Sequence, residues 1–190
     1  MRPPVTPDPP GAAWFIGLPV APGAWHARLQ PPPGHKGVVA SDLHLTVVYL
    51  GAVGQAAALA AWHALGTLPA RTAALGPVVA FGRPAAYSAL AAEVADPGLC
   101  AFIEAQRNPL RALVGQAPEN REPRPHLTVA RPRATCTNAD RAAGVAWAAA
   151  LGLLGTPITL NRIALFTWSD HPGAGAYRIV EEATLQQPCR

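Results

Sequence analysis

The sequence predicts an α+β fold with largely antiparallel sheets. The chain has 190 residues, a length that suits one domain. Half of the residues are hydrophobic, so the chain can bury a sizeable core. Segments with strand character outnumber helical ones, and they do not alternate with helices as regular βαβ units would require. This order of elements favours antiparallel pairing within an α+β domain.

The first half of the chain predicts strands interspersed with helices. Short apolar runs bounded by Gly and Pro indicate buried strands, and a run rich in alanine indicates a helix. In chain order we expect a strand, a short helix, a strand, an alanine-rich helix and two strands, over residues 14–20, 22–30, 43–50, 55–68, 73–81 and 86–94. The strand over 43–50 has the clearest pattern and ends at Gly51.

The second half repeats much of this order. We expect a helix, a strand, an alanine-rich helix and two strands joined by a glycine-rich turn, over residues 99–114, 125–130, 138–154, 158–168 and 177–185. Pro109 is expected to interrupt or kink the first helix, and Asn138 is the expected N-cap of the second. Residues 12–185 are therefore expected to form one domain built from two similar halves. Residues 1–11, rich in proline, are expected to form a disordered tail, and residues 186–190 a second tail.

The number of cysteines and the hydropathy of the chain predict the cellular compartment in which the protein resides. Cys100, Cys136 and Cys189 are odd in number and lack CxxC spacing, so we expect no disulfide framework or Cys-rich zinc site, and a reducing compartment. Two stretches without charged residues, 43–70 and 142–160, are interrupted by polar residues or by proline and are not expected to span a membrane. No secretory signal is apparent, and we expect a soluble, cytoplasmic protein.

The basic residues are almost all arginine. The chain has 15 Lys and Arg against 11 Asp and Glu, a net charge of +4, and Lys36 is the only lysine. Because the guanidinium group donates paired hydrogen bonds to phosphate oxygens, the surplus of arginine suits a partner that carries phosphate. A solvated surface in which high-GC coding replaces Lys by Arg explains the composition equally well.

The most informative feature is a four-residue string that occurs twice. His-Leu-Thr-Val occupies residues 44–47 and recurs 82 positions later at residues 126–129, in both cases within an expected strand. Side chains alternate between the two faces of a strand, so the His and Thr of each copy share one face while the Leu and Val face the core. A repeat that is only structural accounts for the apolar residues but gives no reason to repeat the polar ones.

Two such strands facing each other would place two imidazoles and two hydroxyls around one small anion. Phosphoryl transfer at a phosphodiester suits this set, because one neutral imidazole removes a proton from water while a protonated one gives a proton to the leaving oxygen. The threonine hydroxyls donate hydrogen bonds to the non-bridging oxygens. Histidine supplies both protonation states near pH 7, so this chemistry needs no metal or cofactor.

The two motifs resemble those of the 2H phosphoesterases, most closely the bacterial RNA 2',3'-cyclic phosphodiesterases, also called 2'-5' RNA ligases. The best matching stretches are residues 42–51 and 124–131, with weaker matches at residues 14–20, 82–84 and 168–177. The resemblance covers residues 12–185. It implies a bilobal α+β fold with an antiparallel sheet in each lobe, the two motifs facing each other across a central cleft, and helices on the outside.

The resemblance also implies an activity. Members of the family open 2',3'-cyclic phosphate ends of RNA to a 2'-phosphate, and some join RNA ends reversibly through 2'-5' linkages. Carried over by position, His44 and His126 are the acid and base, and Thr46 and Thr128 bind the phosphate. Family analogy favours His126 as the base that activates water and His44 as the acid that protonates the leaving 3' oxygen. The implied partners are RNA 3' ends or small cyclic nucleotides, bound by a monomer, with no membrane, metal or cofactor.

Three further positions are candidates for RNA binding. Arg124 stands where the family often has an aromatic residue, commonly Phe, and an arginine there offers a phosphate contact in place of base stacking. Tyr49 stands where the family usually has Phe. Strict alternation along the strand puts Arg131 on the face opposite His126, which leaves open whether it makes a structural salt bridge or an RNA contact.

The remaining polar residues near the motifs have weaker assignments. A cluster of four arginines suits either several phosphates or a solvated loop, and consists of Arg121, Arg124, Arg131 and Arg133. Cys100 is expected in the core. No role is expected for His26, His35, His63 and His171, of which His171 is the one to watch because its Gly/Pro-rich loop is a candidate border of the cleft.

Two alternatives to hydrolysis of RNA ends remain open. One is a phosphodiesterase that acts on a small nucleotide, such as ADP-ribose 1'',2''-cyclic phosphate or a 2',5'-oligoadenylate. The other is an RNA-end binding module that keeps the cleft and does little chemistry. The intact pair of motifs argues against the second alternative.

Overall fold

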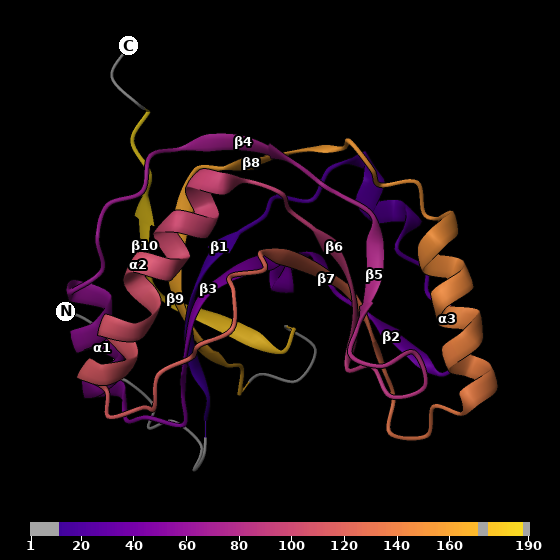
Figure 1. The fold of residues 1–190 in the computed structure, drawn as a ribbon, viewed down its shortest axis with the longest axis horizontal. Helices are drawn as coiled ribbons and strands as arrows, with labels where there is room; N and C mark the ends of the chain where they lie inside the picture. Colours follow the sequence, from indigo (N-terminus) through magenta and orange to yellow (C-terminus); the bar gives the residue numbers. More distant parts are fainter. Residues whose placement is uncertain (1–11, 171–174, 188–190) are drawn as a thin grey trace.

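The computed structural model describes residues 12–170 and 175–187 (Figure 1). Its strands are β1 (Trp14–Pro19), β2 (His35–Gly37), β3 (His44–Gly51), β4 (Arg71–Ala74), β5 (Val78–Phe81), β6 (Ala89–Glu93), β7 (His126–Pro132), β8 (Pro157–Leu160), β9 (Arg162–Trp168) and β10 (Tyr177–Thr184). Its helices are α1 (Gln55–His63), α2 (Pro97–Leu113) and α3 (Asn138–Ala150), with short 3₁₀ helices η1 (Ala24–Arg28) and η2 (Ala40–Asp42). The tail expected over 1–11, His171 and Cys189 lie outside the described residues.

The two motif strands are neighbours in one antiparallel sheet. Within the described residues this sheet has eight strands in the order β10-β9-β1-β3-β7-β6-β5, with β2 paired to β7. β3 and β7 are joined by one residue pair, Leu45 with Leu127. The sheet therefore has two antiparallel halves, one ending at β3 and the other beginning at β7. The predicted α+β class with two antiparallel sheets is confirmed, with the refinement that one residue pair links the two sheets.

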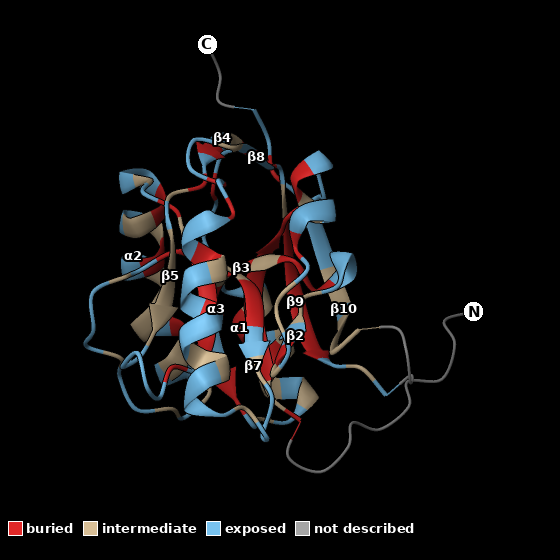
Figure 2. Ribbon diagram, turned by 90° about the vertical axis from the view of Figure 1, so that its right-hand side faces the viewer, coloured by how far each residue is buried: buried red, intermediate tan, exposed pale blue. Residues whose placement is uncertain are grey.

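The helices cover the outer sides of both halves, as expected (Figure 1). α2 packs on β3, α1 packs on β1 and β9, and α3 packs on β5 and β6. Figure 2 shows α3 with its exposed side turned outward. Its buried side includes Gly144, where a Cβ atom would lie 2.5 Å from His35 Nε2 and from the Tyr87 hydroxyl. Glycine at this position therefore lets α3 approach the sheet closely.

Two segments expected as single strands are each divided. The segment 73–81 contains the end of β4 and all of β5, separated by Leu75, Gly76 and Pro77. The segment 158–168 contains most of β8 and all of β9, separated by Asn161. In both cases the chain crosses from the two-stranded sheet β4-β8 to the main sheet. The prediction of one continuous strand in each segment is wrong because each half of the segment finds a different partner.

The N-cap of the second alanine-rich helix lies one residue earlier than expected. Thr137, and not Asn138, is the N-cap of α3, since Thr137 Oγ1 accepts a hydrogen bond from the Asp140 backbone N–H at 3.1 Å. The Asp140 carboxylate in turn accepts the Thr137 backbone N–H at 2.9 Å. This reciprocal capping box positions α3 at its start. The helix ends at Ala150, before Gly152, whose positive φ of 61° ends the helical path.

The helix before the second motif is continuous. Asp96 caps α2 by accepting the Leu99 backbone N–H at 2.8 Å, and the helix begins at Pro97. Pro109 lies inside the helix, which nevertheless runs on to Leu113, so proline does not interrupt it as expected. The other two expected helices are shorter than predicted, since α1 ends at His63 and residues 22–30 contain only the short η1.

The core lies on the apolar face of the motif strands. Leu45, Val47, Leu127 and Val129 are all buried, as the alternation of their strands predicts. At the C-terminal end, the segment expected as a tail is partly attached to the domain, because the Gln186 carbonyl accepts the Ala70 backbone N–H at 2.8 Å.

Among the described helices, none has the length and apolar character needed to cross a bilayer.

Candidate active site

The register between β3 and β7 crosses the two motifs. Because the strands are antiparallel and Leu45 pairs with Leu127, His44 lies across from Thr128 and Thr46 lies across from His126. His44 and Thr128 line a pocket of about 430 Å³, and Thr46 and His126 line a neighbouring pocket of about 670 Å³. The four side chains are half-buried. The two histidines thus occupy one diagonal of a four-cornered arrangement, and the two threonines occupy the other.

Each imidazole is held by the same local hydrogen bond. His44 Nδ1 lies 2.7 Å from the Asp42 carbonyl oxygen, and His126 Nδ1 lies 2.7 Å from the Arg124 carbonyl oxygen. A carbonyl only accepts, so Nδ1 carries the proton and donates it. Within the described residues the Nε2 atom of neither ring has a hydrogen-bond partner. Both rings therefore present Nε2 for proton transfer, and a carbonyl two residues upstream sets the tautomer.

Aromatic rings surround His44. Its ring centroid lies 4.7 Å from that of Phe15, 5.3 Å from that of Phe166 and 5.4 Å from that of Tyr177. Burial lowers the pKa of His44 from 6.5 to about 4, and the charge of Arg131 acts in the same direction against the raising effect of the Asp42 carbonyl. His44 is therefore neutral at pH 7 in the unliganded protein.

His126 has a similar but more open environment. The Phe81 ring lies against it, with the two ring centroids 4.1 Å apart. Burial lowers the pKa of His126, and the charges of Arg124 and Arg131 also lower it, against the hydrogen bond to the Arg124 carbonyl. Both imidazoles are thus biased toward the neutral form before an anion binds. A negatively charged substrate would raise both pKa values.

An irregularity in β3 turns Tyr49 toward the cleft. Gly17 of β1 pairs with Thr46 and Ile16 pairs with Val48, so Val47 is an extra residue in β3. Such a bulge reverses the alternation of the residues that follow it. Tyr49 consequently lies on the same side as Thr46, lines the pocket of His126 and is 52% exposed.

The same irregularity occurs in β7 and corrects the expectation for Arg131. Ala91 of β6 pairs with Thr128 and Leu90 pairs with Ala130, which makes Val129 the extra residue. Arg131 therefore returns to the face of His126 and Thr128 and lines the pocket of His44. Its placement on the opposite face by strict alternation is wrong because of this bulge.

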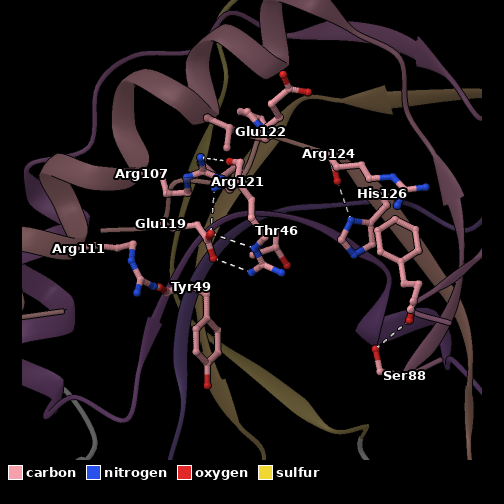
Figure 3. A pocket seen from close by; sticks show the side chains of 15 residues that line it. Thr46, Tyr49, Ser88, Arg107, Arg111, Glu119, Arg121, Glu122, Arg124 and His126 are labelled. Carbon is pink, nitrogen blue, oxygen red and sulfur yellow. Dashed lines mark hydrogen bonds and ion pairs between the residues drawn. The ribbon is translucent and has the colours of Figure 1, made fainter. Parts of the chain in front are cut away.

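Arg124, a candidate for RNA binding, forms an ion pair within its own half of the sheet. Arg124 donates from Nε and Nη2 to Glu93 Oε1 at 2.8 and 2.6 Å, and its guanidinium lies 4.3 Å from the Phe81 ring centroid. It lines the pocket of His126, as Figure 3 shows, but its charge is paired. The aromatic ring beside the second motif comes instead from Phe81 of β5. The motif itself contained no signal for that residue.

The predicted arginine cluster is divided. Arg121 lines the pocket of His126 and pairs with Glu119, whereas Arg133 lines neither pocket and donates to the His35 carbonyl at 3.1 Å. Two arginines of α2 that sequence analysis missed, Arg107 and Arg111, also line the pocket of His126 (Figure 3). Their guanidinium groups donate to carbonyls, Arg107 to that of residue 121, and Arg111 to those of residues 49 and 117. The pocket is therefore rich in arginine, but the guanidinium groups already form ion pairs with carboxylates or hydrogen bonds with backbone carbonyls.

Asp42 is a further residue of the site that the sequence did not indicate. Its carboxylate is buried and accepts the backbone N–H groups of Ala176 at 2.8 Å and Tyr177 at 3.2 Å. These bonds hold the start of β10 against the first motif and keep Tyr177 edge-on to the His44 ring. Asp42 therefore connects the carbonyl that orients His44 with one wall of its pocket.

The other histidines and cysteines within residues 12–170 and 175–187 lie outside the linings of the two pockets. His26 and His35 are bonded elsewhere, His26 to the Val38 carbonyl at 3.2 Å and His35 to the Tyr87 hydroxyl at 2.7 Å, and His63 is exposed at the end of α1. Cys100 on α2 is partly exposed, which corrects its expected place in the core. Within the described residues, no three His, Cys, Asp or Glu side chains are grouped as ligands of a metal ion.

Solved structures with a similar fold include one described as a phosphoesterase. Comparison by sequence matches no family model and no curated protein. By structure, E. coli LigT complexed with 3'-AMP aligns with a TM-score of 0.67 and 20% identity, covering 93% of this chain and 99% of that chain. A Thermus thermophilus protein, TT0787, aligns at 0.67 and 21%, covering 93% and 100%. Usb1 of Kluyveromyces marxianus aligns at 0.51 and 11%, covering 92% and 97%. The chain therefore has the 2H phosphoesterase fold that its motifs predicted.

Proposed function

We propose that the protein is a metal-independent phosphodiesterase that hydrolyses the 2',3'-cyclic phosphate at RNA 3' ends to a 2'-phosphate. The carrying observation is the diagonal placement of His44 and His126, with Thr46 and Thr128 at the other two corners. In an in-line displacement the attacking and leaving oxygens lie on opposite sides of phosphorus. Two imidazoles at opposite corners serve those two oxygens, and the hydroxyls serve the non-bridging oxygens between them.

The reaction moves two protons. Water attacks phosphorus and gives a proton to the neutral Nε2 of one histidine, while the bond from phosphorus to the 3' oxygen breaks and that oxygen takes a proton from Nε2 of the other. The Thr46 and Thr128 hydroxyls donate to the non-bridging oxygens, and Arg131 offsets their charge. The products are a 2'-phosphate and a free 3' hydroxyl.

The assignment of acid and base has two candidate orders. The family resemblance favours His126 as base and His44 as acid. The low pKa of His44, caused mainly by burial, suits a base and favours the reverse order. In the first order the bound phosphate must raise the pKa of His44 above that of His126. Single-histidine variants separate the two orders through the direction of their remaining pH dependence.

The fold comparison supports a nucleotide substrate of this kind. The E. coli LigT structure complexed with 3'-AMP belongs to a protein of the same fold. The two pockets, of about 430 and 670 Å³, are in the usual size range for small-ligand sites. A small cyclic nucleotide or a 2',5'-oligoadenylate is the alternative substrate class, and it requires the same residues. In either case we propose that the protein acts in the cytoplasm as a monomer.

We expect the enzyme to convert an oligonucleotide ending in a 2',3'-cyclic phosphate to the 2'-phosphate in the presence of EDTA, because the proposed residues do not use a Lewis acid. Chromatography of the product against 2'- and 3'-phosphate standards measures this outcome, with the His126→Ala variant as the matched control. Binding without turnover would indicate the non-catalytic module. Turnover lost in EDTA and restored by zinc or manganese would contradict the mechanism.

A further inference from the structure

The only lysine of the chain lies at the edge of the cleft. Lys36 on β2 pairs directly with Arg131 on β7. Residues directly opposite each other in antiparallel strands point to the same face. Both side chains accordingly line the pocket of His44 and Thr128.

Among the residues that the structure describes, this pair of cations has no compensating anion. Within the described residues neither side chain makes an ion pair or a hydrogen bond, and both residues are exposed. Like charges directly opposite each other on neighbouring strands are destabilising. The one carboxylate in the lining of this pocket, that of Asp42, already accepts two backbone N–H groups. A ligand is therefore the remaining source of negative charge for this pair.

The neighbouring pocket shows the opposite arrangement. There Arg124 is paired with Glu93 and Arg121 with Glu119, and the arginines of α2 donate to backbone carbonyls. Among the described residues, the cations of the cleft that make neither an ion pair nor a hydrogen bond are thus Lys36 and Arg131, on the side of His44. The cationic side chains that are free to bind an anion without breaking a bond within the protein therefore lie on one side of the reacting centre.

We propose that Lys36, together with Arg131, binds a second phosphate group of the substrate, next to the phosphate that reacts. The position of the reacting phosphate, at His44 and Thr128, rests on the proposed function. β2 pairs with the edge of β7 that also carries β3, and Lys36 lies across from Arg131, three residues along β7 from Thr128. At roughly 3.3 Å per residue this places Lys36 about 10 Å along the strand from Thr128, beyond the His44 end of β3. A phosphate bound there is separate from the reacting one.

The same pocket has room and an aromatic surface for the nucleoside that connects the two phosphates. Trp168, 43% exposed, and Tyr177 lie in its lining with their ring centroids 5.4 Å apart. Exposed aromatic faces suit stacking of a base. The ligand class is therefore a nucleoside that carries a 5' phosphate in addition to its 2' or 3' phosphate. The end of an RNA chain and a free nucleoside bisphosphate share this chemistry.

The test compares two unreactive nucleotides that differ only in the 5' phosphate. Titration calorimetry measures the Kd of adenosine 3'-phosphate and of adenosine 3',5'-bisphosphate with wild type, Lys36→Gln and Lys36→Arg. We expect the bisphosphate to bind wild type about tenfold more tightly. Lys36→Gln should abolish this advantage, and Lys36→Arg should keep it. Arg28→Gln removes an exposed cation outside both pockets and should also keep it.

A third ligand distinguishes the source of the phosphate. The dinucleotide ApA with a 3'-terminal phosphate replaces the 5' phosphate by an internal phosphodiester. An advantage for ApA that depends on Lys36 indicates an RNA chain, whereas an advantage confined to the bisphosphate indicates a free nucleotide, and each supports the second phosphate site.

The measurements distinguish a failure of the second phosphate site from a failure of the proposed function. Equal affinities in wild type, or an advantage that survives in Lys36→Gln, would overturn the second phosphate site and leave the proposed function standing. A Lys36-dependent advantage without turnover of any cyclic phosphate would overturn the proposed function alone. Failure of wild type to bind either nucleotide would contradict both.

Discussion

Replacing either His44 or His126 with alanine is expected to lower the turnover of a 2',3'-cyclic phosphate by about 10²–10⁴-fold, the usual contribution of a positioned acid or base. The structure gives the reason, since each ring is oriented by a carbonyl 2.7 Å from Nδ1 and presents Nε2 to the cleft. Single-turnover rates at saturating enzyme measure the effect on chemistry directly. Circular dichroism verifies that each variant is folded.

The double variant makes the test more specific. Because the two histidines act on the same displacement, it should lose less than the product of the two single losses. His63→Ala is the matched control, since His63 is exposed at the end of α1 and lines neither pocket. Near-normal activity in a folded His44→Ala or His126→Ala protein would refute the assignment.

Thr46→Val and Thr128→Val are expected to cost about 10- to 150-fold each, the equivalent of roughly 1.5–3 kcal/mol for a hydrogen bond to a charged oxygen. Within the described residues neither hydroxyl has a hydrogen-bond partner, so both are available to a ligand. For the same reason the substitutions break no bond in the unliganded protein, and valine keeps the preference for a strand. Tm should therefore change little.

The rate constant of bond cleavage and Tm are the two measurements, and Thr72→Val in β4 is the control for a strand threonine outside the cleft. A loss of activity that follows a loss of Tm would assign the threonines a structural role. Full activity in both variants would exclude them from phosphate binding.

The motif residues could be predicted from the sequence because their information is local. A repeated His-Leu-Thr-Val string, with alternating polar and apolar positions, indicates both the strands and the face that carries the chemistry. The structure adds the crossed register, in which each histidine lies across from the threonine of the other motif. That relation depends on how β3 and β7 pair, and neither motif contains it alone.

The bulges explain why Arg131 was misplaced. The extra residue in each motif strand, Val47 or Val129, is defined by the register with a different neighbour, β1 or β6. Alternation counted along one strand cannot show it. As a consequence the residue five positions after each histidine, Tyr49 or Arg131, returns to the cleft.

The residues missed by sequence analysis come from segments distant in the chain. Phe81 on β5 reaches His126 through two strand pairings, and Lys36 reaches the cleft only because β2 pairs with β7. The divided segments 73–81 and 158–168 have the same origin, since the two-stranded sheet β4-β8 is a long-range pairing. Local pattern predicted where strands occur, whereas tertiary pairing decided where they end.

The dependence of kcat/KM on pH tests the two-histidine mechanism most directly. Free enzyme is competent when one imidazole is protonated and the other neutral, so the profile should be a bell whose limbs report the pair. Burial lowers the pKa of His44 to about 4 and lowers that of His126 below its ordinary 6.5. Both limbs of kcat/KM should therefore lie below about pH 6.5, with the acid limb near pH 4. The profile of kcat should shift to higher pH, because the bound anion raises both values.

In each variant that lacks one of the two histidines, the pH profile of kcat/KM should keep only one of its two limbs. If the remaining imidazole is the base, residual activity rises with pH to a plateau, and if it is the acid, residual activity falls as pH rises. We expect one behaviour in His44→Ala and the opposite behaviour in His126→Ala. A wild-type kcat/KM that rises steadily to about pH 10 without an alkaline limb would show that hydroxide, and not this pair, carries the reaction.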